Sequence, residues 1–276
     1  MPAEVFALDT ICETARMSII LAVAAFLYLA AASVTALRLR QGGARIGRAP
    51  VIAFAMLAVL AHAAGVAIGI RVHHGLVLNF GNALSLVGLG MALVFSLAGR
   101  RSSLDPVGVL VYPIAAACCL AALLLAPAAT ATAPESWQIG LHGIISLLAY
   151  STLSVASLVA ILMAVQEHAL RNHRPLPFLH ALPLTLTEAL LFQLIGVGFI
   201  LLGLSLVTGV LFVEDMLAQH LVHKTVLTVA AWVVFGVLLV ARWRFGLRGR
   251  RAAWLTLAGM VLLLVGYFGV KLILAN

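Results

Sequence analysis

The sequence predicts an all-α integral membrane protein, a polytopic bundle of about eight transmembrane helices, and two observations carry this prediction. Hydrophobic residues make up 64% of the 276 residues and charged residues only 9%, with a mean hydropathy of +1.16. A soluble domain carries about 25% charged residues, so too few polar side chains remain to cover a water-facing surface. The apolar residues also form long runs, and a backbone in lipid satisfies its hydrogen bonds internally as a helix.

Each predicted helix is an apolar run close to the length of about 20 residues that crosses a bilayer core. We expect one transmembrane domain over residues 1–276. The runs span roughly 17–37, 51–70, 82–98, 107–126, 139–165, 189–212, 223–241 and 252–273. The acidic N-terminal stretch lacks the basic segment of a signal peptide, so the first run is expected to stay as a helix. Thr187 and Glu188 resemble a cap that opens the sixth helix.

Lys and Arg concentrate in alternate loops. Most of the 17 basic residues follow the first, third, fifth and seventh runs: Arg38, Arg40, Arg45, Arg48, Arg100, Arg101, Arg171, Arg174, Arg242, Arg244, Arg248, Arg250 and Arg251. Because such loops stay in the cytoplasm, we expect both termini outside and a multi-pass location in a bacterial inner membrane. Basic charge placed in this way indicates topology and not a nucleic-acid interface, which would gather it on one soluble face.

Polar residues inside membrane helices are the first candidates for function, and histidine is the notable type here. His142 lies at the outer start of the fifth helix, and Ser146 and Tyr150 follow at i+4 and i+8, on one helix face. His220 and His223 lie at the outer start of the seventh helix. Two imidazoles at the same depth on different helices can hold haem iron from both sides. Two interfacial histidines bonded to water are the alternative.

Three further residues, His62, Lys224 and Arg71, are also candidates for binding a cofactor. His62 lies near the middle of the second helix, where a neutral histidine often hydrogen-bonds to a neighbouring helix. A second haem site or a proton relay is the alternative for His62. Lys224 lies near the outer surface and needs an anionic partner. Glu214, Asp215 or a haem propionate could serve, and a propionate would also suit Arg71.

Four blocks in the second half of the chain resemble the cytochrome c assembly family of membrane proteins, the CcsA/CcmC-like haem handlers, and in particular its YpjD/HemX-like branch. They occur in order as LHGIISLLAY (141–150), GFILLGLSLVTG (198–209), HKTVLTVAAW (223–232) and GLRGRRAAWLTLAGMVLLLVGYFGV (246–270). The resemblance implies that His142 matches an outer-face haem ligand and Tyr150 a tyrosine eight positions later. It also implies that Lys224 and Trp232 match a lysine and a tryptophan that follow the family's tryptophan-rich loop.

The sequence departs from the larger family members at that loop. Leu221, Val222 and His223 occupy the positions of a Trp-Asp-Pro sequence, and Val240 replaces an inner histidine. The loop that presents haem in those members is therefore absent. His223 arises where that loop was lost, which makes it the natural replacement ligand.

The leading hypothesis is a haem b site near the outer face, with His142 and His223 as iron ligands, His220 in reserve and His62 at a deeper site. We expect haem handling or a role in cytochrome c biogenesis, with membrane lipids and haem as partners, and not enzymatic attachment of haem to an apocytochrome. The alternative is a cofactor-free accessory or regulatory subunit, which exerts HemX-like control of haem synthesis or binds another membrane or cytoplasmic protein. A transporter has less support, because no acid lies in a helix core and no inverted repeat is evident.

Overall fold

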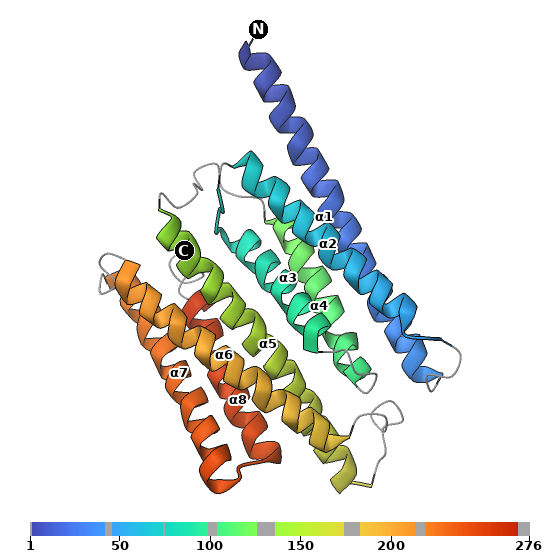
Figure 1. Ribbon diagram of the computed structural model, residues 1–276, viewed down its shortest axis with the longest axis vertical. Helices are drawn as coiled ribbons and strands as arrows, with labels where there is room; N and C mark the ends of the chain where they lie inside the picture. Colours follow the sequence, from blue (N-terminus) through green and yellow to red (C-terminus); the bar gives the residue numbers. More distant parts are fainter. Residues whose placement is uncertain are drawn as a thin grey trace. The chain divides into compact units, whose positions relative to one another are not determined.

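A computed structural model describes residues 2–41, 46–73, 75–98, 104–125, 136–173, 183–212 and 219–269, although the side chains of 2–10, 219–221 and 268–269 are not described. The helices are α1 (Pro2–Arg40), α2 (Ala49–Val72), α3 (Phe80–Ala98), α4 (Asp105–Leu124), α5 (Trp137–Arg171), α6 (Leu184–Phe212), α7 (Gln219–Phe245), α8 (Gly249–Leu264) and the π-helix η2 (Val265–Gly269) (Figure 1). Eight helices in this part of the chain are long and apolar enough to cross a membrane. The predicted all-α polytopic fold is confirmed. The external position of the termini stays a prediction.

Each predicted run overlaps one helix, but several helices are longer than predicted. α1 and α5 contain 39 and 35 residues, well beyond the length of about 20 that the hydrocarbon core requires. The predicted cap at Thr187 is wrong, because α6 begins earlier, at Leu184. The Thr187 hydroxyl lies inside the first turn, 3.3 Å from the carbonyl oxygen of Pro183 and 3.2 Å from Oε1 of Gln166.

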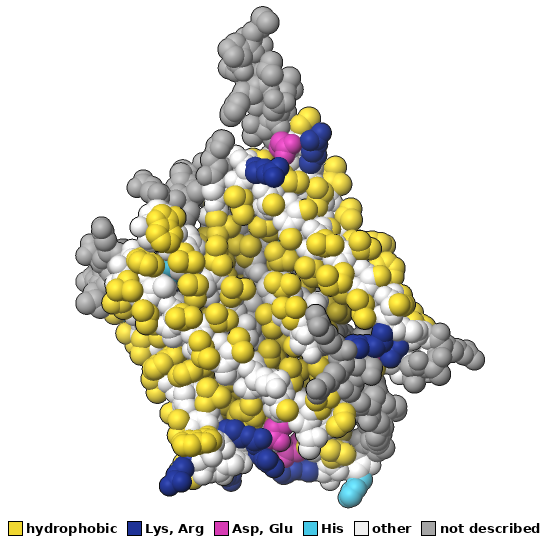
Figure 2. Space-filling view, in the orientation of Figure 1, with side chains coloured by type: hydrophobic (Ala, Val, Ile, Leu, Met, Phe, Trp, Pro, Cys, Tyr) yellow, Lys and Arg dark blue, Asp and Glu magenta, His cyan; other side chains and the backbone are white. Residues whose placement is uncertain are grey.

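The helices form two compact units, Met1–Gly140 with α1 to α4 and Leu141–Asn276 with nearly all of α5 and the later helices. In the first unit α1 packs along α2 and α4, and α3 packs along α4; in the second, α7 packs along α6 and α8. Large apolar side chains such as Phe26 and Val210 are 70% and 73% exposed. Figure 2 shows a face made mostly of hydrophobic side chains with few Lys and Arg, as expected where lipid is the solvent.

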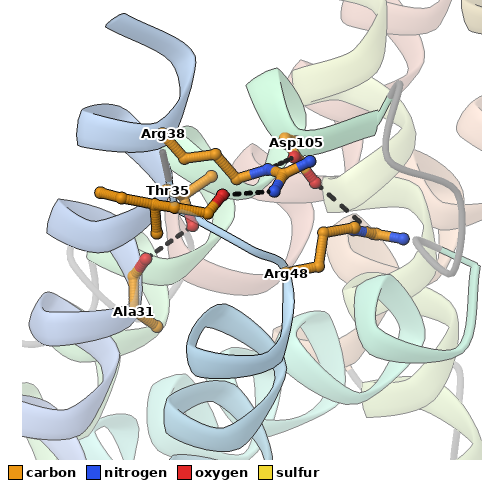
Figure 3. A network of polar contacts seen from close by, with 6 residues as sticks. Ala31, Thr35, Arg38, Arg48 and Asp105 are labelled. Atoms are coloured by element: carbon orange, nitrogen blue, oxygen red, sulfur yellow. Dashed lines mark hydrogen bonds and ion pairs between the residues drawn. The ribbon is translucent and has the colours of Figure 1, made fainter. Parts of the chain in front are cut away.

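A buried carboxylate joins three helices at the end of the first unit that we expect in the cytoplasm. Asp105, in the first turn of α4, accepts a bond of 2.8 Å from Nε of Arg38 on α1. Its other oxygen lies 3.4 Å from Nη2 of Arg48, the residue before α2 (Figure 3). Arg38 also donates to the carbonyl oxygen of Ile46 at 2.7 Å, which ties the α1–α2 connection to the same cluster.

The second unit repeats this arrangement with other residues. Glu188, near the start of α6, lies 2.6 Å from Nη1 of Arg242 at the end of α7 and 3.5 Å from Nε of Arg248 just before α8. In both units one carboxylate therefore bridges two arginines that flank a helix connection. Arg45, Arg100, Arg101 and Arg174 of the predicted cytoplasmic loops lie outside the described residues.

Two glycines of α6 provide a matched pair for testing helix packing. A Cβ atom at Gly198 would lie 2.5 Å from the side chain of Leu153 on α5, whereas nothing lies within 4 Å of one at Gly196. We expect Gly198→Ala to lower the free energy of unfolding by about 1–3 kcal/mol through overpacking. Gly196→Ala is expected to be neutral or to stabilise by up to about 1 kcal/mol, because alanine favours the helix. Denaturant titration in micelles measures both; equal effects would contradict close α5–α6 packing at Gly198.

Candidate functional site

A cavity of about 210 Å³ lies between α5, α6, α7 and η2 in the second unit. Three polar residues of α5, namely His142, Ser146 and Tyr150, contribute to its lining. The spacing of i, i+4 and i+8 thus places all three on one face, as the sequence predicted. The remaining lining residues come from the other three helices: Leu202, Ser205, Leu206, Lys224, Thr225, Thr228 and Tyr267.

The His142 imidazole is half-buried and is oriented by α6. Its Nδ1 atom lies 3.1 Å from Oγ1 of Thr208. The single hydroxyl proton of Thr208 points to backbone carbonyl oxygens, those of Leu204 at 2.9 Å and Ser205 at 3.1 Å. The oxygen of Thr208 is therefore the acceptor, and His142 donates through Nδ1. This hydrogen bond selects the tautomer that carries its lone pair on Nε2.

The Nε2 atom of His142 faces a pair of serine hydroxyls. The Ser146 Oγ atom lies 3.5 Å from Nε2, a long contact, and 2.7 Å from Oγ of Ser205. Ser146 also lies 2.7 Å from the carbonyl oxygen of His142, one turn earlier on α5. Because the two short contacts satisfy the Ser146 hydroxyl, Nε2 has only a weak protein partner and remains accessible to a ligand in the cavity.

Tyr150 of α5, Tyr267 of η2 and Lys224 of α7 form the aromatic and cationic part of the cavity wall. The Tyr150 hydroxyl donates to the carbonyl oxygen of Leu263 at 3.1 Å, and its ring contacts Tyr267 with centroids 5.3 Å apart. The Lys224 ammonium lies 4.5 Å from the centre of the Tyr267 ring, in cation–π geometry. This part of the wall is thus aromatic and carries one positive charge. Glu214 and Asp215, the acidic partners considered for Lys224, lie outside the described residues.

The other predicted residues of α7 are placed differently. His223 is exposed and is not among the side chains that line the cavity. The side chain of His220 lies outside the described residues, but its backbone is one helical turn before Lys224 on α7. Trp232 stacks on Phe199 of α6 with ring centroids 4.8 Å apart, and its buried Nε1 atom has no hydrogen-bond partner among the described residues. Trp232 therefore packs α7 against α6 and does not line the cavity.

His62 and Arg71 belong to the first unit. The His62 ring is fully buried on α2, with Nε2 2.8 Å from Oγ of Ser85 and Nδ1 3.4 Å from the Tyr28 hydroxyl. Both nitrogens have hydroxyl partners, which supports the hydrogen-bonding role that the sequence also allowed. Arg71 is exposed in the last turn of α2.

Sequence reasoning missed Ser205 and Tyr267, which line this cavity, and Thr208, which contacts the His142 ring. The sequence did carry a weak signal, because Ser205 and Thr208 are the two hydroxyl residues within the otherwise apolar stretch 194–212. The assembled donor set contains an imidazole with an accessible nitrogen, a cation and two aromatic rings. Such a set suits a planar, anionic, metal-containing ligand better than a reaction that needs a nucleophile and a base.

Comparisons with a family model and with individual proteins point to the same family. Residues 50–275 match the sequence model of the family described as Cytochrome C assembly protein. The inner membrane protein YpjD of Escherichia coli (strain K12) is 32% identical over 263 residues, which cover 92% of this chain and 96% of that protein.

Two further relatives match over different extents. A 28.8 kDa protein of Azospirillum brasilense is 40% identical over 151 residues, so the match covers 54% of this chain and 55% of that protein. The cytochrome c biogenesis protein CcsA of Thermosynechococcus vestitus is 26% identical over 240 residues, or 71% of this chain and 75% of CcsA. The matches to YpjD and to this CcsA therefore take in helices of both compact units.

Proposed function

Because this chain belongs to the cytochrome C assembly protein family, we propose that it binds haem b in the cavity of the second unit and acts in haem handling for cytochrome c biogenesis. It is a multi-pass protein of the bacterial inner membrane, as the eight apolar helices of its described residues and its likeness to YpjD show. By the positive-inside rule, the start of α5 and the start of α7, which border the cavity, are expected on the outer side of the membrane.

The observation that carries the proposal is the orientation of His142. The bond from Nδ1 to Thr208 fixes the ring and leaves the Nε2 lone pair on the cavity side. Histidine ligands of metals are held in this manner, with the other ring nitrogen bound to an acceptor that fixes the tautomer. Haem bound at Nε2 would supply an iron centre, whose potential depends on its axial ligands.

The rest of the cavity suits the porphyrin. Tyr150 and Tyr267 offer aromatic surface, and the Lys224 ammonium is placed to neutralise a propionate. The cavity of about 210 Å³ is below the range of about 300–1,000 Å³ that is usual for pockets enclosing a ligand. The cavity would therefore enclose only part of a haem.

A second histidine at the start of α7 would complete the iron coordination. His223 is the residue predicted from the sequence, although it is exposed in this structure. Position 220 precedes Lys224 and Thr228 by one and two helical turns, so it lies on the same face of α7 as these two residues. We infer that one of these two histidines would be the second ligand of the iron, and the helical position favours His220.

The experiment that tests this function is titration of detergent-purified protein with haem, followed by the Soret absorption. We expect saturable binding, and Thr208→Val should weaken it by about 10–100-fold because the ring of His142 loses its anchor. Thr208→Ser keeps the hydroxyl and should restore most of the affinity. Equal affinities for the three proteins, or binding that does not saturate, would contradict the proposal.

A further inference from the structure

A second cavity lies in the first unit and has no role in the proposed haem site. It measures about 520 Å³ and is lined from α2, α3 and α4, with Thr35 of α1 at its edge. Several of its lining residues are exposed, including Ile52 at 51% and Leu97 at 61%. These exposed residues lie on membrane-spanning helices, so the surroundings of the cavity beside them are expected to be apolar.

Half of the residues that line the cavity have aliphatic side chains, and five of these lie along α2. Val51, Ala55 and Val59 recur at intervals of four residues, and Ile52 and Met56 lie beside them. From Arg48 to Val59 this face extends about 16 Å along the helix axis, at about 1.5 Å per residue. A long apolar wall in apolar surroundings fits an acyl chain. None of the lining side chains is a histidine, so the iron ligand proposed for the second unit has no counterpart in this cavity.

One end of the cavity is charged. Arg48 and Asp105 line it there, and Asp105 also binds Arg38 (Figure 3). One carboxylate faces two guanidinium groups, so the cluster carries a net positive charge of one. The side chain of Arg48 is 24% exposed and that of Asp105 is 6% exposed, so the cation of the cluster is the more accessible group. An anionic group is therefore favoured at this end, next to the apolar wall.

We propose that this cavity binds an anionic glycerophospholipid, with one acyl chain along α2 and α3 and the phosphate at Arg48. By the positive-inside rule this end of the unit lies in the cytoplasmic leaflet, where anionic lipids give the surface a negative potential. Arginine suits a phosphodiester because its planar guanidinium offers paired donors. Such a lipid would fill the space between α2 and α3 and join both helices to the Arg38–Asp105–Arg48 cluster. This inference does not depend on haem binding in the second unit.

The test is retention of lipid by the full-length protein, measured by native mass spectrometry after exchange into mixed micelles with phosphatidylglycerol or phosphatidylcholine. Wild-type protein should retain phosphatidylglycerol about fivefold better than phosphatidylcholine, because one arginine attracts the net negative headgroup more strongly than the zwitterionic one. Arg48→Gln should lose this preference and should still fold, because Arg38 keeps the closer bond to Asp105. Arg40→Gln is the matched control. Arg40 is exposed in the last turn of α1, close to Arg38 in sequence, and does not line the cavity.

A cavity-filling variant tests the position of the acyl chain. Ala55 is buried on the aliphatic wall, so Ala55→Leu should reduce retention of both lipids while thermal unfolding remains cooperative. Addition of glycerol phosphate without acyl chains distinguishes a lipid from a free phosphate and should not displace bound phosphatidylglycerol. Equal retention of the two lipids by the wild-type protein would overturn the proposal whatever the variants do. An unchanged preference in Arg48→Gln would also overturn it.

Discussion

Replacement of His142 by alanine is expected to remove the Soret band of the haem-loaded protein. The imidazole is the described cavity residue with an accessible nitrogen ligand. Its removal should therefore lower the haem affinity by more than the factor of about 10–100 expected when only its hydrogen-bond partner is lost. Absorption of the variant, purified from haem-replete cells, measures the effect. Free imidazole should restore part of the band if the cavity is otherwise intact.

The matched control is His168→Ala. His168 is an exposed histidine on the same helix, near the opposite end of α5, where its Nε2 atom lies 2.8 Å from Nδ2 of Asn172. This variant should keep wild-type haem content. A Soret band of full intensity in His142→Ala, or equal losses in both variants, would show that His142 does not bind the iron.

Replacement of Asp105 by alanine is expected to give the largest loss of stability. The change leaves two partly buried guanidinium groups without the carboxylate that bridges them. Removal of one partner from a buried ion pair costs about 3–5 kcal/mol, because the remaining charge stays buried without compensation. Denaturant titration of the purified protein in micelles measures this cost as a lower free energy of unfolding.

An exposed ion pair on α1 provides the comparison. Glu13 and Arg16 lie 3.1 Å apart, with side chains that are 39% and 70% exposed. Glu13→Ala should cost less than about 1 kcal/mol, as is usual for surface pairs. If Asp105→Ala costs no more than Glu13→Ala, the buried cluster does not hold α1, α2 and α4 together.

The helices could be predicted from the sequence because a membrane imposes a minimum length and a uniformly apolar composition on each of them. The ends of the helices were harder to predict. A helix such as α5 continues into the interface with residues that are no longer apolar, and hydropathy alone cannot detect that extension. The Arg38–Asp105 pair joins residues 67 positions apart. Nothing local in the sequence indicates that Asp105, beside a proline at the start of an apolar run, turns inward and not toward water.

The α5 face of the candidate site was predictable because its three polar residues repeat with the period of a helix. The partner residues depend on how adjacent helices are rotated. On α7, His223 and Lys224 are adjacent in sequence and so about 100° apart around the helix, and Lys224 is the one that lines the cavity. Likewise, the register that brings Thr208 to His142 depends on contacts such as Leu153 against Gly198, which only the packed structure reveals.

The central claim is that this protein holds haem b at the His142 cavity, and its haem content tests that claim most directly. The wild-type chain should be purified from haem-replete cells and assayed by the pyridine haemochrome spectrum. We predict haem b at about one molecule per chain. Protein without haem under these conditions, still folded and binding none on titration, would contradict the account and favour a cofactor-free accessory subunit built on the same helices.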